Sequence, residues 1–223
     1  MSGLVANALS EYYQRPVIIT FKVKGDYLGS LRVPDTDNPL FKNFKDQCEE
    51  SGYCTFVAGH QEAAGIGIQD GHIEDLIAYF DNKYEGQDTD LMYNVDFVID
   101  ANDPKLPKLI EEMYQIRNIH GQGLKAPRIA VTNVKIAPSS LRLVGQKSST
   151  LWITCPNCKF INFKSSREEY NSLRCPVDES GIEAYYTATI IGDQPDLNEW
   201  NNTVTPQMQI VDYEINTTPH YEF

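Results

Sequence analysis

The order of hydrophobic and polar positions divides the chain into two parts. In the first part, apolar residues at helical spacing alternate with short β-branched runs, which predict helices and strands respectively. In chain order these are a helix at 3–13, strands at 17–21 and 27–33, a helix at 38–50, a strand at 54–57 and a helix from residue 70. Asn38 is the expected N-cap of the second helix, with Pro39 in its first position. Strands that alternate with helices favour a small α/β domain over residues 1–84.

The second part has mainly a period of two. The polar residues 85–90 predict a linker, and a strand-like run at 91–99 and an amphipathic helix at about 104–116 follow it. Further strands are expected at 128–136, 141–144, 150–154, 160–163, 184–192 and 207–213. Short strands separated by turn residues are typical of a small OB-type β-barrel, here over residues 91–216, with a patternless tail at 217–223. The predicted fold class is therefore α+β, an α/β domain followed by an OB-type barrel.

Composition excludes several classes of protein. The chain is 41% hydrophobic and 11% aromatic, which excludes a disordered low-complexity protein. No apolar run approaches the roughly 18 residues of a membrane span. The N-terminus lacks the basic-then-apolar layout of a signal peptide, so we expect a cytoplasmic protein. The net charge of −12 argues against a nucleic-acid partner, because phosphate contacts need Lys and Arg.

The distribution of charge changes that conclusion. Residues 46–116 contain three basic and sixteen acidic side chains, and residues 178–223 contain nine acidic and no basic ones. The stretch between them has no acidic residue from 117 to 167 and nine basic ones, namely Arg117, Lys125, Arg128, Lys135, Arg142, Lys147, Lys159, Lys164 and Arg167. Either this stretch pairs with the acidic tail, or it forms a basic surface for a polyanion on an acidic scaffold. Only the second interpretation predicts binding that weakens as salt rises.

Cysteine spacing leaves a metal site open. The odd number of five cysteines, with no secretory signal, indicates free thiols in a reducing compartment. Cys155 and Cys158 have the spacing of zinc ligands and Cys175 lies beyond them, but Asp178 stands where a fourth cysteine would be. The alternative is a Pro-Asn turn between two strands, with the cysteines as small apolar residues.

Two short motifs in the first domain are candidate phosphate ligands. Ser30 and Arg32 lie two residues apart on a predicted strand, so a hydroxyl and a guanidinium point to one face and can hold one phosphate. His60 lies between Gly59 and Gly65, which allow tight turns and close backbone approach to a ligand. The alternatives are an exposed strand arginine and a packed loop histidine. The sequence contains no Walker loop, nucleophile elbow or clustered His/Asp set that would indicate a hydrolytic centre.

These motifs occur in the order found in a known family. The order is Gly3-Leu4-Val5-Ala6 with Arg15-Pro16-Val17, then Gly29-Ser30-Leu31-Arg32, then residues 59–65, then the β-rich part. Residues 1–215 thereby resemble the C-terminal half of RecJ-type single-stranded-DNA exonucleases. The first three features resemble the DHHA1 domain of that family, with its G-S-x-R and G-G-H-x-x-A-A-G motifs, and the β-rich part resembles the OB-type domain that follows it. Markers of the latter are residues 121–123, Pro127, Val144-Gly145, Leu151, residues 198–200, Gln207, Ile210 and Asp212.

The chain also departs from the family pattern. Ala58 replaces the first glycine of G-G-H, and Trp152 stands where an H-L-K motif has its lysine. Other departures are Ile119, His120, Leu124 and Thr150. They indicate a divergent phage or prophage member of the family, which implies the cytoplasm of a bacterium or of a phage-infected host.

The resemblance implies a function shared between the two domains. The DHHA1-like domain would grip the 5′ end of a DNA strand through Ser30, Arg32, Gly59 and His60. The OB-type domain would guide the strand along a basic groove that includes Arg117, Lys125, Arg128 and Lys147, with Trp152 or Phe160 as stacking surfaces; core packing is the alternative for Phe160. The family binds Mn or Mg in an N-terminal DHH domain outside these 223 residues. The chain is therefore expected to bind single-stranded DNA without hydrolysing it alone, with the DHH half supplied in cis or in trans.

Two other functions stay open. One is a DHHA1-type phosphoesterase component for short oligonucleotides or cyclic dinucleotides, against which the β-rich part argues. The other is a noncatalytic, zinc-stabilised adaptor.

Overall fold

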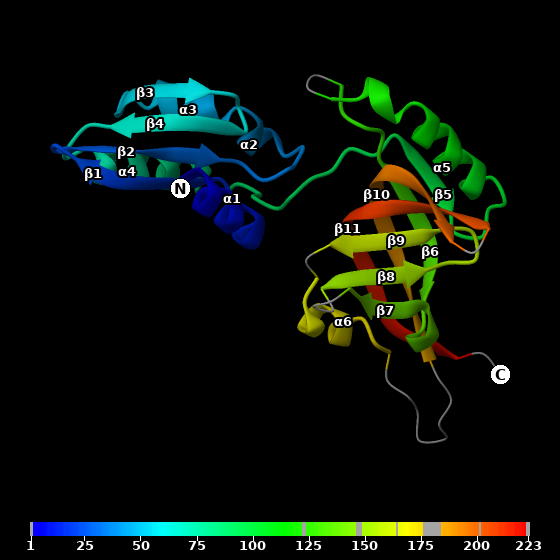
Figure 1. Ribbon diagram of the computed structural model, residues 1–223. Helices are drawn as coiled ribbons and strands as arrows, with labels where there is room; N and C mark the ends of the chain where they lie inside the picture. The colour runs from blue at the N-terminus through cyan, green and yellow to red at the C-terminus, as the bar shows by residue number, and fades with distance from the viewer. Residues whose placement is uncertain are drawn as a thin grey trace. The chain divides into compact units, whose positions relative to one another are not determined.

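The protein forms two compact units, Met1–Asn94 and Val95–Phe223, in a computed structural model that describes residues 2–121, 124–145, 149–163, 165–175, 184–200 and 202–221 (Figure 1). Both units combine helices with a largely antiparallel sheet, so the predicted α+β class is confirmed. No helix within these ranges has the length and apolar character needed to cross a membrane.

The first unit contains a four-stranded sheet in the order β1-β2-β4-β3, and every ladder in it is antiparallel (Figure 1). Its elements are α1 (Ser2–Tyr13), β1 (Val17–Val23), β2 (Asp26–Arg32), α2 (Pro39–Lys42), α3 (Phe44–Glu50), β3 (Cys54–Gly59), β4 (Ala63–Ile68) and α4 (Ile73–Tyr84). The Asn38 side chain accepts a hydrogen bond from the Leu40 amide at 2.9 Å, as expected of an N-cap. The single helix predicted at 38–50 is wrong, because Asn43 interrupts it between α2 and α3.

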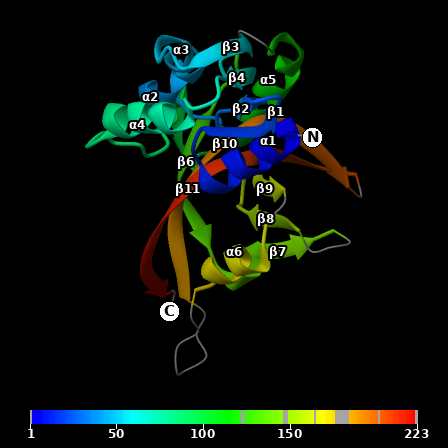
Figure 2. The same ribbon diagram turned by 90° about the vertical axis from the view of Figure 1, so that its left-hand side faces the viewer.

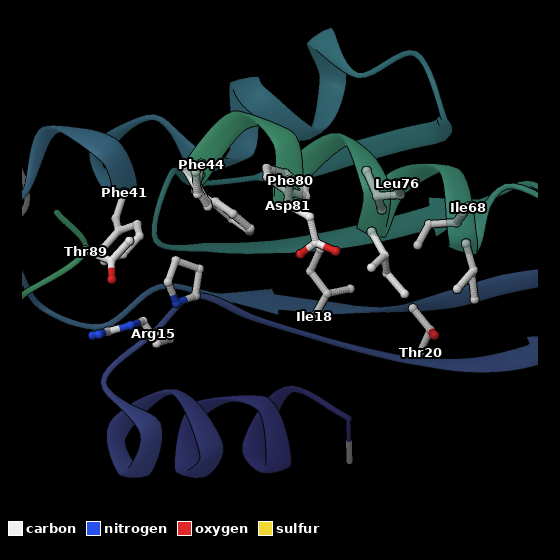
Figure 3. Close-up of a pocket in the computed structure, with 14 residues that line it drawn as sticks. Arg15, Ile18, Thr20, Phe41, Phe44, Ile68, Leu76, Phe80, Asp81 and Thr89 are labelled. Carbon is white, nitrogen blue, oxygen red and sulfur yellow. The ribbon is translucent and has the colours of Figure 1, made fainter. Parts of the chain in front are cut away.

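Helices cover the two faces of this sheet differently. One face packs through Leu31, Ala64 and Ile66 into a core shared with Phe44 and Leu76 of α3 and α4. A cavity of about 400 Å³ lies on this side and is lined by residues of the sheet and of α4. Figure 3 shows these residues, with α1 on the opposite side of the sheet. On that opposite face, α1 packs against β1 and β2.

The segment that the sequence predicts as a linker is bound to the first unit. The Thr36 hydroxyl donates to the Met92 carbonyl at 3.1 Å and accepts from the Met92 amide at 3.0 Å. The Asn38 side-chain amide donates to the carbonyl of Asp90 at 2.6 Å. The boundary of the compact units accordingly falls at residues 94 and 95, a few residues beyond the predicted linker at 85–90.

The second unit has one seven-stranded sheet in the order β5-β6-β10-β11-β9-β8-β7. Its strands are β5 (Phe97–Asp100), β6 (Ile129–Ile136), β7 (Leu141–Val144), β8 (Thr150–Thr154), β9 (Lys159–Phe163), β10 (Ala184–Trp200) and β11 (Thr203–Tyr221). Its helices are α5 (Leu106–Gln115), α6 (Arg167–Ser172) and two 3₁₀ turns, Arg117–Ile119 and Pro138–Ser140. No ladder between described residues joins the edge strands β5 and β7, so the described strands form an open sheet and not a closed barrel.

The β10–β11 hairpin is the largest difference from the predicted elements. The two strands have 17 and 19 residues and curve through the unit in Figures 1 and 2, whereas the pattern predicts only 184–192 and 207–213. Register shifts between Ile191 and Gly192 and between Asp193 and Asp196 change which face each side chain points to, so the alternation breaks. β11 also continues through the patternless tail, where His220 pairs with Tyr185 and their rings stack 5.4 Å apart.

Candidate nucleic-acid-binding site

The sheet register places three predicted site residues on one face of the first unit. Ser30 and Arg32 of β2 pair with Gly65 and Ala63 of β4, respectively. His60 closes the β3–β4 hairpin on Ala63, donating its amide to the Ala63 carbonyl at 2.9 Å and accepting in return at 3.2 Å. Residues directly opposite each other in antiparallel strands share a face, so Arg32, Ala63 and His60 form one row across the sheet. This is the face that carries α1.

The N-terminus of α1 completes the surroundings of Ser30 and Arg32. The Ser2 hydroxyl lies 2.9 Å from the Ser30 hydroxyl. A Cβ atom on Gly3 would lie 2.7 Å from Nη2 of Arg32 and 3.6 Å from Oγ of Ser30, so glycine lets the helix end approach both side chains. The first amides of a helix have no intrahelical acceptor and carry partial positive charge. Two hydroxyls, a guanidinium and a helix N-terminus thus meet at one place, a combination suited to a phosphate.

Arg32 carries a positive charge that no described carboxylate neutralises. The described part of the chain contains no ion pair to Arg32. Its Nη1 donates to the Leu31 carbonyl at 2.6 Å, which fixes the half-buried side chain and leaves its other donors for a ligand.

Between Arg32 and His60 the sheet surface is made of small residues. Ala63 is the residue between them in the row. Gly59 pairs with Ala64 and so belongs to the opposite face; its φ of +139° is a conformation that other residues rarely adopt, and a Cβ there would lie 2.5 Å from the Ala63 carbonyl oxygen. Ala58 pairs with Gly65, beside the row of Arg32 and His60. Two strand spacings separate β2 from β3, roughly 10 Å, and nothing larger than a methyl group rises between them at these rows. His60 is exposed at the edge of this shallow floor.

In the second unit, two predicted basic residues line one pocket. A cavity of about 590 Å³ is bordered by Arg117, Lys125, His120 and the β10–β11 bulge at 194–196. The Arg117 guanidinium lies 3.7 Å from the centre of the Tyr114 ring and donates to the Tyr114 carbonyl at 2.8 Å. The buried Nδ1 atom of His120 has no hydrogen-bond partner among the described residues.

A second basic group surrounds Trp152. Arg142 of β7 pairs with Trp152 of β8, and the Lys159 ammonium from β9 lies 4.1 Å from the centre of the Trp152 ring. Partial burial lowers the pKa of Lys159, and the nearby positive charge of Arg142 lowers it further. Neither cation forms an ion pair with a described carboxylate. An uncompensated pair of cations beside an indole ring is suited to a nucleotide, whose phosphate and base would engage the charges and the ring.

Other predicted residues lie elsewhere. Arg128 is buried at 5% exposure, its amide donating to Asp96 Oδ2 at 2.9 Å, so it contributes little to an exposed groove. Phe160 is fully buried, so its interpretation as a core residue is confirmed and its stacking role is wrong. Lys147 lies outside the described residues.

The cysteine motif forms a tight turn between β8 and β9. The Cys155 amide donates to the Cys158 carbonyl at 2.9 Å, and Asn157 donates to the Ala101 carbonyl at 3.1 Å, which ties the turn to the loop after β5. Cys155, Cys158 and Cys175 are buried. Among the described residues, no group of three or more His, Cys, Asp or Glu is arranged to hold a metal ion; Asp178 lies outside them. The geometry favours the interpretation of the motif as a turn with buried cysteines over its interpretation as a zinc site.

This interpretation makes a prediction about metal content. Protein prepared without added metal should contain less than about half an equivalent of zinc, and excess EDTA should leave its melting temperature unchanged, since metal that holds a fold contributes directly to its stability. Elemental analysis and calorimetry measure both quantities. One equivalent of zinc with an EDTA-induced loss of stability would instead support the adaptor hypothesis.

Comparison with known proteins adds an independent observation. No known family model matches the sequence. The chain is 27% identical over 227 residues to YorK of Bacillus subtilis strain 168, named as a candidate SPbeta prophage-derived single-strand DNA-specific exonuclease, and equally to its counterpart in Bacillus phage SPbeta. These alignments cover all of this chain but only 38% of each relative. The chain resembles part of a phage-derived exonuclease.

Solved structures show the same fold. RecJ from Thermus thermophilus in complex with Mn²⁺ matches 95% of the chain with a TM-score of 0.55 at 18% identity. The Mg²⁺ complex of the same protein matches with a TM-score of 0.52 at 16% identity. The match covers 28% and 30% of those chains, respectively. The predicted resemblance to a RecJ-type fragment of phage origin is therefore confirmed, and the chain spans well under half the length of these relatives.

Sequence reasoning missed two neighbours of the site. Ser2 was not a candidate, because its proximity to Ser30 depends on how α1 packs across the sheet. Phe56 is 46% exposed on the same face, where its ring lies over Gly67 of β4. An aromatic residue two positions before Ala58 is a signal that the sequence does contain.

Proposed function

We propose that this chain is the strand-binding portion of a RecJ-like 5′→3′ single-stranded-DNA exonuclease. In this proposal the first unit binds the 5′ phosphate through Ser30, Arg32 and His60, and the second unit guides the strand. One observation carries the proposal: the register sets Arg32 and His60 on one row, and the N-terminus of α1 adjoins the same face. The similarity to a phage-derived exonuclease supports DNA as the polyanion.

Each group has a distinct task in this proposal. The guanidinium of Arg32 provides charge and a planar fork of donors for two phosphate oxygens. The Ser30 hydroxyl and the first amides of α1 donate to the remaining oxygens. His60, across the small floor, would donate to a phosphate oxygen from the opposite side. Together they position one phosphate without performing hydrolysis themselves.

We further propose that the catalytic Mn or Mg ions are bound by residues outside these 223, in a DHH half supplied in cis or in trans. The chain spans 38% of its curated relatives, which leaves room for such a half in a protein of that kind. The RecJ structures of the same fold contain Mn²⁺ and Mg²⁺. The chain's own residues would hold and orient the strand while that half breaks the phosphodiester bond.

Affinity for single-stranded DNA should fall as salt rises. Each phosphate neutralised on a single strand contributes about −0.7 to the slope of log affinity against log salt, so three or four contacts give a slope of roughly −2 to −3. Fluorescence anisotropy of a labelled oligonucleotide between about 50 and 300 mM salt measures this slope. Lys159→Ala should make the slope shallower by about 0.7.

One control makes this measurement decisive. The labelled strand should keep its full length when Mn²⁺ is added, so that anisotropy reports binding alone. Equal affinity at both salt concentrations, or no binding at either, would contradict the proposal.

A further inference from the structure

Phe56 is an exposed aromatic residue beside the proposed phosphate site. It lies on β3, where Cys54 pairs with Ile68 and Phe56 with Gly67, so Thr55 is an extra residue in the ladder. Such a bulge re-aims the side chains that follow it. Val57 consequently points into the core, whereas Phe56 and Ala58 share the other face of the sheet with Ser30 and Arg32.

The Phe56 ring rests on a floor of glycines. A Cβ on Gly67 would overlap Cε1 of Phe56, and a Cβ on Gly65 would lie 3.8 Å from Cε2. The ring therefore extends along β4 from Gly67 toward Gly65, in space that any larger residue at position 67 would fill. Because the side chain is 46% exposed, part of the ring surface is open to a ligand.

The surroundings of this ring favour a nucleotide over an apolar partner. Phe56 lies on β3 and His60 directly follows the last residue of that strand, so the two are separated by about 13 Å of extended chain, which a short run of nucleotides spans. The rows between and including them contain no carboxylate; across β1, β2, β4 and β3 they read Phe21-Leu28-Gly67-Phe56, Ile19-Ser30-Gly65-Ala58 and Val17-Arg32-Ala63-His60. One end of the face thus carries Arg32 and His60, and the other an aromatic ring.

We propose that Phe56 is a stacking platform for a nucleobase near the 5′ end of the strand. This rests on the proposed function, because the phosphate held by Arg32 and His60 brings the base to the ring. Stacking needs only the π-face that every base has, so the platform accepts any of the four bases. It adds affinity and alignment for the first nucleotides without reading their sequence.

The test uses the full chain and a labelled 5′-phosphorylated oligonucleotide. Phe56→Ala should weaken binding about tenfold, since removal of one stacking aromatic has an effect of that order. Phe56→Tyr should bind as the unsubstituted protein does, because it keeps the ring. Phe21→Ala is the matched control: Phe21 is 55% exposed at the far end of the same row, and its loss should leave the affinity unchanged.

Abasic nucleotides separate stacking from a structural effect. Three oligonucleotides carry an abasic site at the first, second or third nucleotide, and one of them should bind the unsubstituted protein more weakly than the intact strand does. For that oligonucleotide, Phe56→Ala should cause no further loss of affinity. The proposal would be overturned if Phe56→Ala weakened binding of all three abasic strands as much as binding of the intact strand. It would also be overturned if Phe56→Ala did not weaken binding of the intact strand, or if Phe21→Ala weakened it equally. If Arg32→Ala weakens binding while Phe56→Ala does not, stacking fails and the phosphate site stands; if neither matters, the proposed function fails as well.

Discussion

Arg32→Ala should weaken binding of 5′-phosphorylated single strands by about 10- to 100-fold, the range expected when hydrogen bonds to a charged group are lost. The reason is that the guanidinium adjoins Ser30 and the N-terminus of α1 and has no ion pair with a described carboxylate. Competition anisotropy with 5′-phosphate and 5′-hydroxyl oligonucleotides of equal sequence measures the effect. The loss should be much smaller for the hydroxyl strand, because its terminal phosphate is missing.

Two further variants separate geometry from charge. Arg32→Lys keeps the charge but loses the planar fork, so its affinity should lie between those of the unsubstituted protein and Arg32→Ala. Lys42→Ala removes an equal charge from an exposed position on α2. If Lys42→Ala and Arg32→Ala weaken binding equally, Arg32 acts only through the general field of the domain and the phosphate site is wrong.

Local sequence patterns predicted the fold where local contacts determine it. The bounds of β7 and β8 match the predicted 141–144 and 150–154, because each strand alternates regularly between a buried and an outer face. The long β10–β11 hairpin was predicted only in part. Register shifts and a left-handed Gln194 divide its alternation into short pieces that resemble separate strands. α6, with Ser166 as its N-cap, was not predicted because it is too short to show a helical period.

The site was predictable as separate pieces and not as an arrangement. The spacing of Ser30 and Arg32 predicts a shared face from the two-residue period of a strand alone. That His60 joins their row depends on β4 lying between β2 and β3, which is a property of the tertiary fold. The burial of Arg128 is likewise a property of the tertiary fold, in which its backbone amide donates to Asp96, 32 residues earlier in the chain. Charge density along the sequence could not separate this buried arginine from exposed ones.

The positions of the charged residues explain why a net charge of −12 is compatible with binding a polyanion. Within the basic stretch, Arg117, Arg142, Lys159 and Arg167 form no ion pair with a described carboxylate. The carboxylates that outnumber them are spread over other parts of the chain. Local potential at these cations, and not the sum over the molecule, governs the approach of a phosphate. An acidic protein can therefore bind a polyanion at a few uncompensated sites.

Gly29→Ala should destabilise the first unit by about 3 kcal/mol, and lower its melting temperature by roughly 15 °C, as expected for overpacking against backbone in a domain of this size. Gly29 precedes Ser30 in the phosphate motif, but its constraint is packing: a Cβ there would overlap the carbonyl oxygen of Ile19 on β1. Because that atom belongs to the backbone, the clash can be relieved only by separating β1 from β2.

The two units allow this effect to be located. Both tryptophans, Trp152 and Trp200, belong to the second unit, so tryptophan fluorescence reports its unfolding, whereas calorimetry reports both units. Gly29→Ala should lower a calorimetric transition that tryptophan fluorescence does not follow. Gly65→Ala is the matched control in the same sheet, since its Cβ would make only an ordinary contact of 3.8 Å, and its stability should change by no more than about 1 kcal/mol. Equal stability of the two variants would show that β1 and β2 tolerate a side chain at residue 29.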